Sequence, residues 1–108
     1  MAHSSHANPI KIGEIVRVEE FPGLKKPAYK IFVDCGGSDT ALSSYAHVTE
    51  LYLPEDLIGK QVAVIFMPKR KKGFLAEVRI LCADTPEGMV VLQPETPVAN
   101  GAYVDWRP

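Results

Sequence analysis

The sequence predicts an all-β fold, a small five-stranded barrel with one short helix. Three observations lead to this prediction. Apolar and polar residues alternate with a period of two over several segments, which is typical of strands with one buried face. Clusters of glycine and proline separate these segments at short intervals. With 108 residues, the chain has the length of one domain with a single hydrophobic core.

The first half of the chain contains three predicted strands. In "KIGEIVRVEEF", residues 11–21, valines alternate with charged residues, and the glycine in the Gly13–Ile15 step predicts a β-bulge. After the turn "FPGLKKP", the segment "AYKIFVDC", residues 28–35, alternates again. Both of its faces carry apolar residues, as expected for a coiled strand in a closed barrel. The third predicted strand is "SDTALSS", residues 38–44.

A helical period follows the third strand. In "YAHVTELY", residues 45–52, apolar side chains recur at helical spacing, and Ser44 is placed to cap the N-terminus of that helix. The segment "PEDLIG", residues 54–59, predicts one further helical turn, because proline starts it, acids occupy its first turn and glycine ends it. Strands then resume in "QVAVIFM", "FLAEVRILC" and "MVVLQP".

The predicted order is therefore three strands, a short helix, and two or three more strands. A helical segment between the third and fourth strands of a five-stranded antiparallel barrel is the layout of the OB-fold. SH3-like barrels and small β-sandwiches have similar strand spacing and are the alternatives. We expect residues 10–108 to form this domain and the polar residues 1–9 to form a flexible N-terminal arm.

The composition favours a cytoplasmic protein without a membrane partner. No apolar run approaches the length needed to cross a bilayer, and the polar start "MAHSSHANP" differs from a secretory signal peptide. Cys35 and Cys82 stand far apart in apolar segments, so we expect reduced, buried thiols in preference to a disulfide. The net charge is only −1, but residues 83–104 contain no Lys or Arg, which concentrates the cations elsewhere.

Five segments occur in a fixed order between Ile12 and Val104: "GEIVRVEEFP", "PAYKIFVDCG", "SSYAHVTELYLPEDLIGKQV", "MPKRKKGFLAEVRIL" and "VVLQPETPVANG". In order and spacing they resemble the stand-alone tRNA-binding domains of the export-related chaperone CsaA type. This domain also occurs fused to methionyl- and phenylalanyl-tRNA synthetases. The resemblance implies an OB-fold, a homodimer, and binding of structured RNA, chiefly tRNA, without catalysis. It also implies an alternative function, a molecular chaperone that binds unfolded or export-destined polypeptides.

Two positions depart from the pattern of that family. Its members often have Asn in the strand before the basic loop, where this chain has "VIFMP". They also often have Ser two residues after the "GF" pair, where this chain has Ala76. Both changes remove polar groups from the presumed ligand surface, which favours the chaperone alternative. A purely structural dimeric domain is a third alternative.

The basic run in "MPKRKKGF" is the first candidate RNA site. It supplies four cations, Lys69, Arg70, Lys71 and Lys72. Such a loop can neutralise phosphates and release condensed counterions, although a solvated hairpin tip is the alternative. Phe74, next to the run, and Phe32, on the polar-alternating face of the second strand, are candidate platforms for unpaired bases. The alternative for both rings is core packing.

Other candidate RNA contacts lie on the first three strands. Arg17 and Lys30 alternate with apolar neighbours near the binding face expected of an OB-fold, and Lys25 and Lys26 lie in the loop between their strands. These cations could instead be ordinary exposed side chains. The hydroxyls of Ser43 and Ser44 could contact phosphate or a ribose 2′-OH, with helix capping as the alternative role of Ser44.

The sequence predicts no catalytic residues, no metal site and no cofactor. His3 and His6 are in the arm, and His47 has no second ligand at a spacing that suits a metal. There is no glycine-rich phosphate loop of the P-loop or Rossmann form. We therefore expect a binding protein and not an enzyme.

Overall fold

The computed structural model describes residues 9–21, 25–37, 41–67 and 78–106. Most of the predicted N-terminal arm lies outside these residues. No described helix has the length and apolar character needed to span a bilayer. The described elements are β1 (Ile10–Phe21), β2 (Ala28–Asp34), β3 (Leu42–Ala46), α1 (Pro54–Leu57), β4 (Gln61–Phe66), β5 (Val78–Ile80), β6 (Cys82–Thr85) and β7 (Gly88–Val91).

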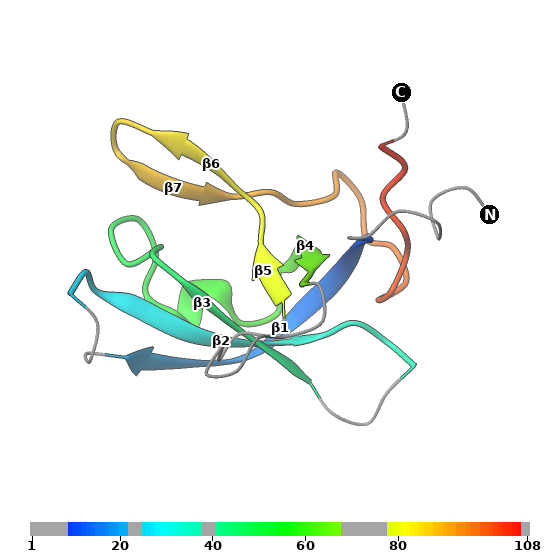
Figure 1. Ribbon diagram of the computed structural model, residues 1–108, viewed down its shortest axis with the longest axis horizontal. Coiled ribbons are helices and arrows are strands. Elements are labelled where there is room, and N and C mark those ends of the chain that lie inside the picture. The colour runs from blue at the N-terminus through cyan, green and yellow to red at the C-terminus, as the bar shows by residue number, and fades with distance from the viewer. Residues whose placement is uncertain (1–8, 22–24, 38–40, 68–77, 107–108) are drawn as a thin grey trace.

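Five of the strands form one antiparallel sheet in the order β3-β2-β1-β4-β5. The edge strands β3 and β5 also contact each other, so the sheet curls into a near-barrel (Figure 1). The helix α1 lies between β3 and β4 along the chain. The predicted fold, an all-β five-stranded barrel of the OB type with a short helix between the third and fourth strands, is confirmed.

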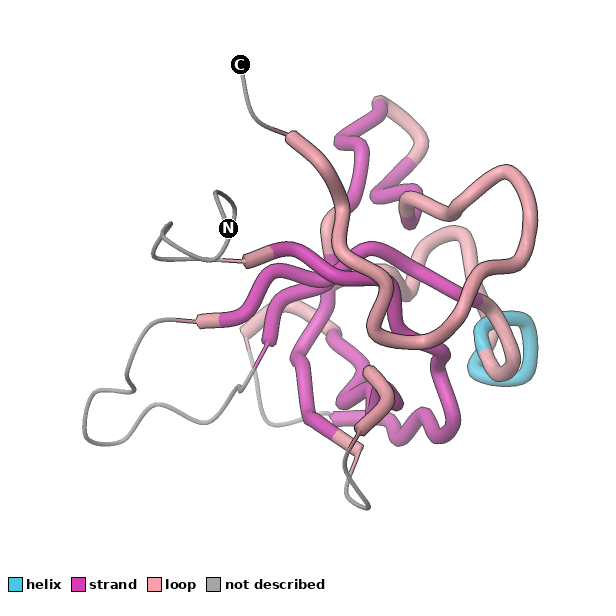
Figure 2. Tube along the Cα trace, turned by 90° about the vertical axis from the view of Figure 1, so that its right-hand side faces the viewer, coloured by secondary structure: helices cyan, strands magenta, loops and turns pink. Residues whose placement is uncertain are grey.

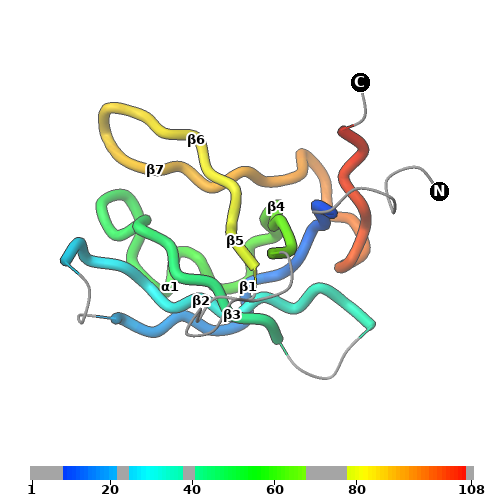
Figure 3. Tube along the Cα trace, viewed as in Figure 1, coloured from blue at the N-terminus to red at the C-terminus, as the bar shows by residue number. Residues whose placement is uncertain are grey.

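Strands β6 and β7 pair as a separate two-stranded sheet, joined by a turn at Pro86 and Glu87. This hairpin lies over the part of the barrel that contains β2 and β3 (Figure 3). Two tyrosines connect this hairpin to the barrel through hydrogen bonds. The Tyr29 hydroxyl donates a hydrogen bond to the Tyr52 carbonyl at 2.8 Å. The Tyr52 hydroxyl accepts a hydrogen bond from the Val91 N–H at 3.2 Å. The hairpin is thereby linked to the barrel core.

The core fills the inside of the barrel with β-branched side chains. Successive inward positions of β2 and β4 are buried, including Ile31, Val33, Val62 and Val64. Leu57 of α1 is also fully buried, and α1 packs against β1 at one side of the strands (Figure 2). Since the interior is occupied by packed side chains, a ligand has to bind on the outside of the sheet or at its rim.

A β-bulge in β1 determines which side chains reach the outside. The pairing of β1 with β2 shifts between Ile15 and Arg17, so Val16 has no partner across the pair. A bulge was predicted in the Gly13–Ile15 step, one residue before its actual position. The extra residue leaves Val16 exposed, turns Arg17 outward and lets Val18 pack against the core.

The helix predicted over residues 45–52 is wrong. Its first two residues belong to β3, and residues 49–51 form a turn. The helical turn predicted at residues 54–59 is confirmed as α1, where the Asp56 carboxylate accepts a 2.9 Å hydrogen bond from the Leu53 N–H. Ser44 lies inside β3 and caps no helix, so its predicted capping role is also wrong.

The C-terminal segment pairs with the first residues of β1, which precede the part of β1 that pairs with β2. Backbone hydrogen bonds join Gly101 N–H to the Ile12 carbonyl at 2.7 Å and Val104 N–H to the Ile10 carbonyl at 2.8 Å. Gly101 has φ +96°, and a Cβ there would meet the Cys35 carbonyl, so only glycine fits this close approach. In Figure 1 the segment runs beside the start of β1.

Candidate nucleic-acid interface

The outward side chains of three adjacent strands form one surface, which we call the β1–β3 outer face. The register places Arg17 opposite Phe32 and Glu19 opposite Lys30. Strand β3 then places Ser43 opposite Phe32 and Tyr45 opposite Lys30. Because paired residues of an antiparallel sheet point to the same side, these side chains share one face. The members of the outer face are Arg17, Glu19, Phe21, Lys30, Phe32, Ser43 and Tyr45.

Cations and aromatic rings are interleaved on this face. The Arg17 guanidinium carbon lies 5.2 Å from the centre of the Phe32 ring, and the Lys30 Nζ lies 5.3 Å from the same centre. Lys30 Nζ is also 5.8 Å from the centre of the Tyr45 ring. All three distances are within the range of cation–π attraction, which holds the cations against the rings. The face therefore presents positive charge directly beside flat apolar surface.

Charge on the face is partly compensated by Glu19. Its carboxylate forms an ion pair with Arg17 between two exposed side chains. Exposed pairs of this kind contribute only about 0–1 kcal/mol, so an incoming phosphate can replace the carboxylate at small cost. Phe21 extends the aromatic surface, since its ring centre lies 4.9 Å from that of Tyr45.

The structure brings four of the predicted RNA-site residues together on the outer face, namely Arg17, Lys30, Phe32 and Ser43. Phe32 is half-buried on this outer face and is not a core residue. Lys25 and Lys26 are exposed just before β2. The predicted site residues Lys69, Arg70, Lys71, Lys72 and Phe74 lie outside the described residues, in the part of the chain that connects β4 to β5.

The two predicted serines have opposite orientations. Ser43 is on the outer face, beside Phe32, with 9% of its surface exposed. Ser44 points into the barrel opposite Ile31 and has no exposed surface. Ser44 therefore has no surface with which to contact RNA in this structure. The Ser44 hydroxyl is buried without a hydrogen-bond partner among the described residues.

The sequence prediction missed Tyr45 and Phe21 as members of this surface. Tyr45 was assigned to a helix, and its alternation with Ser43 was the signal that would have placed both on one strand face. A second cation–aromatic contact was also missed at the start of β1. There, Lys11 Nζ lies 4.8 Å from the ring centre of Tyr103 and 5.2 Å from that of Phe66.

The described residues contain no group of three or more His, Cys, Asp or Glu side chains arranged to hold a metal ion. Cys35 and Cys82 are both free thiols, and each is half-buried, whereas buried thiols were predicted. Burial raises the pKa of each thiol, most directly for Cys82; at Cys35 the nearby Lys11 partly opposes this rise, and Asp34 adds to it. Raised pKa values disfavour the thiolate, the form that a nucleophilic cysteine needs.

Comparison of the sequence with known proteins identifies a family of tRNA-binding domains. Residues 10–103 match the family model of the putative tRNA binding domain. The methionine–tRNA ligase of Pyrococcus furiosus is 33% identical over 97 residues, which is 88% of this chain and 13% of the ligase. The corresponding ligase of Methanocaldococcus jannaschii is 39% identical over 85 residues, 77% of this chain and 13% of that enzyme. The chain therefore spans only about an eighth of these relatives.

Solved structures of similar length share the whole fold. The chaperone CsaA of Bacillus anthracis superposes with a TM-score of 0.77 at 35% identity, covering 91% of both chains. The CsaA chaperone protein of Picrophilus torridus superposes with a TM-score of 0.80 at 29% identity, covering 97% of this chain and 98% of its own. The described fold is thus that of a stand-alone domain in these two proteins.

Proposed function

The chain belongs to the putative tRNA binding domain family, and we propose that it binds structured RNA of the tRNA class, without catalysis, through the β1–β3 outer face. The observation that carries this proposal is the placement of Arg17 and Lys30 against Phe32. A polyanion with exposed bases needs both kinds of group, cations for phosphate and flat rings for stacking.

Recognition on this face would follow backbone shape more than base sequence. Arginine and lysine make charge-assisted contacts with phosphate oxygens, which position an RNA but carry no sequence information. Stacking on Phe32 or Tyr45 accepts any unpaired base, because every base has a π-face. We expect the four cations Lys69 to Lys72, between β4 and β5 in the chain, to add further phosphate contacts.

The proposal includes a homodimer. One near-barrel of this size presents two well-placed cations on its outer face, and the chain as a whole carries a net charge of −1. Two copies acting on one RNA would convert the second contact into an intramolecular one, which raises the apparent affinity without new side chains. The two-fold arrangement would let both outer faces reach separate parts of a bent RNA.

A second candidate function is capture of unfolded polypeptides, in the cytoplasm as for the first. Three large apolar side chains near α1, Leu51, Leu53 and Ile58, are exposed. Exposed apolar patches mark interaction sites in soluble proteins, and these three side chains would contribute to such a patch. The full-length structural similarity to proteins described as CsaA chaperones supports the same candidate.

One salt series tests the two functions against each other. The protein is mixed with total tRNA, and separately with a reduced, unfolded polypeptide, from about 50 to 500 mM salt. We expect tRNA binding at low salt that weakens steeply as salt rises, because counterion release drives it. Polypeptide binding that persists or strengthens with salt, without tRNA binding, would replace the first function by the second. If the protein binds neither tRNA nor the unfolded polypeptide, both candidate functions are wrong.

A further inference from the structure

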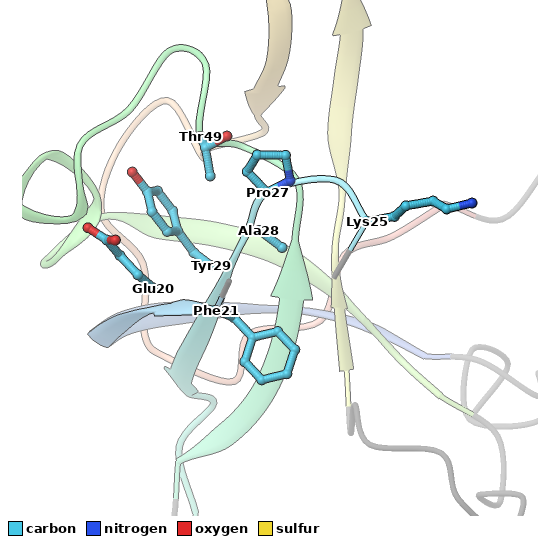
Figure 4. A pocket seen from close by; sticks show the side chains of 7 residues that line it. All are labelled: Glu20, Phe21, Lys25, Pro27, Ala28, Tyr29 and Thr49. Carbon is cyan, nitrogen blue, oxygen red and sulfur yellow. The ribbon is translucent and has the colours of Figure 1, made fainter. Parts of the chain in front are cut away.

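A hollow of about 350 Å³ adjoins the outer face at the rim of the barrel (Figure 4). Its lining comes from the end of β1, the start of β2 and the turn after β3. The residues that line it are Glu20, Phe21, Lys25, Pro27, Ala28, Tyr29 and Thr49. Its volume is near the lower end of the roughly 300–1,000 Å³ typical of small-ligand clefts, which suits a single planar group.

The pocket is continuous with the proposed RNA surface through Phe21. This residue lines the pocket, and its ring is the neighbour of Tyr45 on the outer face. Its alternating neighbour Glu20 points to the other side of the strand, opposite Tyr29. A strand of RNA lying on the outer face could therefore turn one unpaired base over this rim.

The walls of the pocket are held in place before any ligand arrives. Tyr29 is buried, and its hydroxyl is fixed by the 2.8 Å hydrogen bond to the Tyr52 carbonyl. Proline at position 27 has a locked φ, and its carbonyl lies 3.0 Å from Nδ1 of His47. Burial, together with the negative charge of Glu20, raises the pKa of the Tyr29 phenol, which keeps its ring neutral. Because these walls are already ordered, a ligand that binds between them loses little free energy in ordering them.

The chemistry of the pocket is distinctive because it contains an acid beside an anion-binding face. Figure 4 shows the Glu20 carboxylate next to the Tyr29 ring, with Thr49 and Pro27 across from them and Lys25 on the far side. Among the described residues, no side chain pairs with this carboxylate. A carboxylate repels phosphate, so in an RNA site it has to accept hydrogen bonds from RNA donors, which are the N–H groups of the bases and the ribose 2′-OH.

Guanine is the base whose edge fits such a carboxylate. Its N1–H and N2–H groups are adjacent donors that match the two oxygens of a carboxylate, which only accepts. Adenine, cytosine and uracil place an acceptor next to each donor on the same edge, which a carboxylate disfavours. Lys25, on the side away from Glu20, is suited to a phosphate adjoining that base. The hydroxyl of Thr49 can donate or accept and so adapts to the remaining polar atoms of the ring.

We propose that this rim pocket binds one unpaired guanine of the RNA, with Glu20 reading its N1–H and N2–H groups. This inference rests on the proposed RNA function and adds a base preference to a surface that otherwise recognises backbone. Unpaired bases displayed in loops are the usual targets of sequence-specific RNA recognition. The loops of a structured RNA would therefore supply a ligand for this pocket.

The test uses three fluorescent octamers of uridine that carry one central guanosine, inosine or adenosine, measured by anisotropy at about 50 mM salt. Inosine retains N1–H and lacks the N2 amino group, so it isolates the second hydrogen bond. We expect the guanosine octamer to bind about tenfold more tightly than the other two, as for a good bidentate contact. Glu20→Gln should abolish the preference. Glu87→Gln, which makes the same charge change on the exposed β6–β7 turn, should preserve it.

The other possible outcomes distinguish failure of the guanine inference from failure of the proposed RNA function. Binding of tRNA with no preference for guanosine would overturn this inference and leave the proposed function standing. A preference that survives Glu20→Gln would show that another site reads the base, which also overturns it. Failure of both tRNA and all octamers to bind would remove the function and this pocket together. As an independent check, guanosine monophosphate should shift the amide resonances of Ala28 and Thr49 in the wild type and not in Glu20→Gln.

Discussion

The two faces of strand β2 differ completely in role although their residues alternate one by one. Tyr29, Ile31 and Val33 point inward and are buried in the core. Lys30 and Phe32 point outward, with the Lys30 Nζ 5.3 Å from the centre of the Phe32 ring, in the surface that we propose to bind RNA. Since strand side chains alternate with a period of two, seven residues can supply a core and a binding face at once. We therefore expect inward substitutions to change stability and outward ones to change affinity.

Replacing Ile31 by alanine should produce the largest effect. Ile31 is fully buried, and truncating such a side chain costs about 2–5 kcal/mol in the free energy of unfolding, through reduced burial and the cavity left behind. Urea denaturation followed by circular dichroism measures this decrease. Val16→Ala at the exposed bulge is the matched control, with an expected change below about 0.5 kcal/mol. Equal decreases for the two variants would contradict the assignment of faces.

Replacing Phe32 by alanine should weaken RNA binding with a small change in stability. Removing the platform for one stacked base costs about 1–3 kcal/mol, or roughly a 5- to 150-fold rise in the Kd for tRNA. Phe32→Leu is the control for apolar volume and should bind nearly as weakly, because leucine has no π-face. Filter binding or anisotropy with total tRNA measures the Kd. An unchanged Kd in both variants would mean that Phe32 supports structure and does not stack on RNA.

The contrast between the faces explains which parts of the molecule could be predicted from sequence. The alternation in β2 is local, so it predicted the strand and the outward positions of Lys30 and Phe32 correctly. The helix over residues 45–52 was wrong because the apolar spacing there also fits a 3.6-residue period, and pairing with β2 overrides it. The position of the bulge depends on the register between β1 and β2, which no local pattern encodes.

The cation–aromatic arrangement itself could not be predicted from the sequence. Arg17, Phe32 and Tyr45 come from three different strands, and their approach depends on two registers and on the bulge at Val16. Sequence reasoning identified Arg17, Lys30 and Phe32 singly, by residue type and exposure. It could not recognise Phe21 and Tyr45 as a ring pair, since they lie on different strands and meet only after folding.

The reactivity of Cys35, the residue after the end of β2, gives a further test of the buried face of this strand. Cys35 follows the inward residues and packs against the core, and burial raises its thiol pKa despite the nearby Lys11. A raised pKa means less thiolate at a given pH, so alkylation by iodoacetamide should be slower in the native protein than in urea at about pH 8. The two rates should converge as pH rises above the native pKa. Fast native alkylation near neutral pH would contradict the burial of this thiol.

Replacing Ser44 by alanine should have the smallest effect. The Ser44 hydroxyl is fully buried opposite Ile31 and has no hydrogen-bond partner among the described residues. Removing a buried, unpaired hydroxyl relieves a desolvation penalty, so the free energy of unfolding should stay within about 1 kcal/mol of wild type or rise. Urea denaturation measures it, and the Kd for tRNA should not change. A large decrease in stability would show that the hydroxyl is paired in solution.

The salt dependence of tRNA binding by the double variant Arg17→Ala/Lys30→Ala tests the central claim most directly. Its matched control is Lys60→Ala, which removes a cation from a separate pocket beside Gln61 and Pro94. If the outer face holds phosphates, the slope of log K against log salt should become shallower by about 0.7–0.9 for each phosphate that is no longer neutralised, and the control should keep the wild-type slope. Identical slopes and affinities for the double variant and the wild type would contradict the claim that the β1–β3 outer face binds RNA.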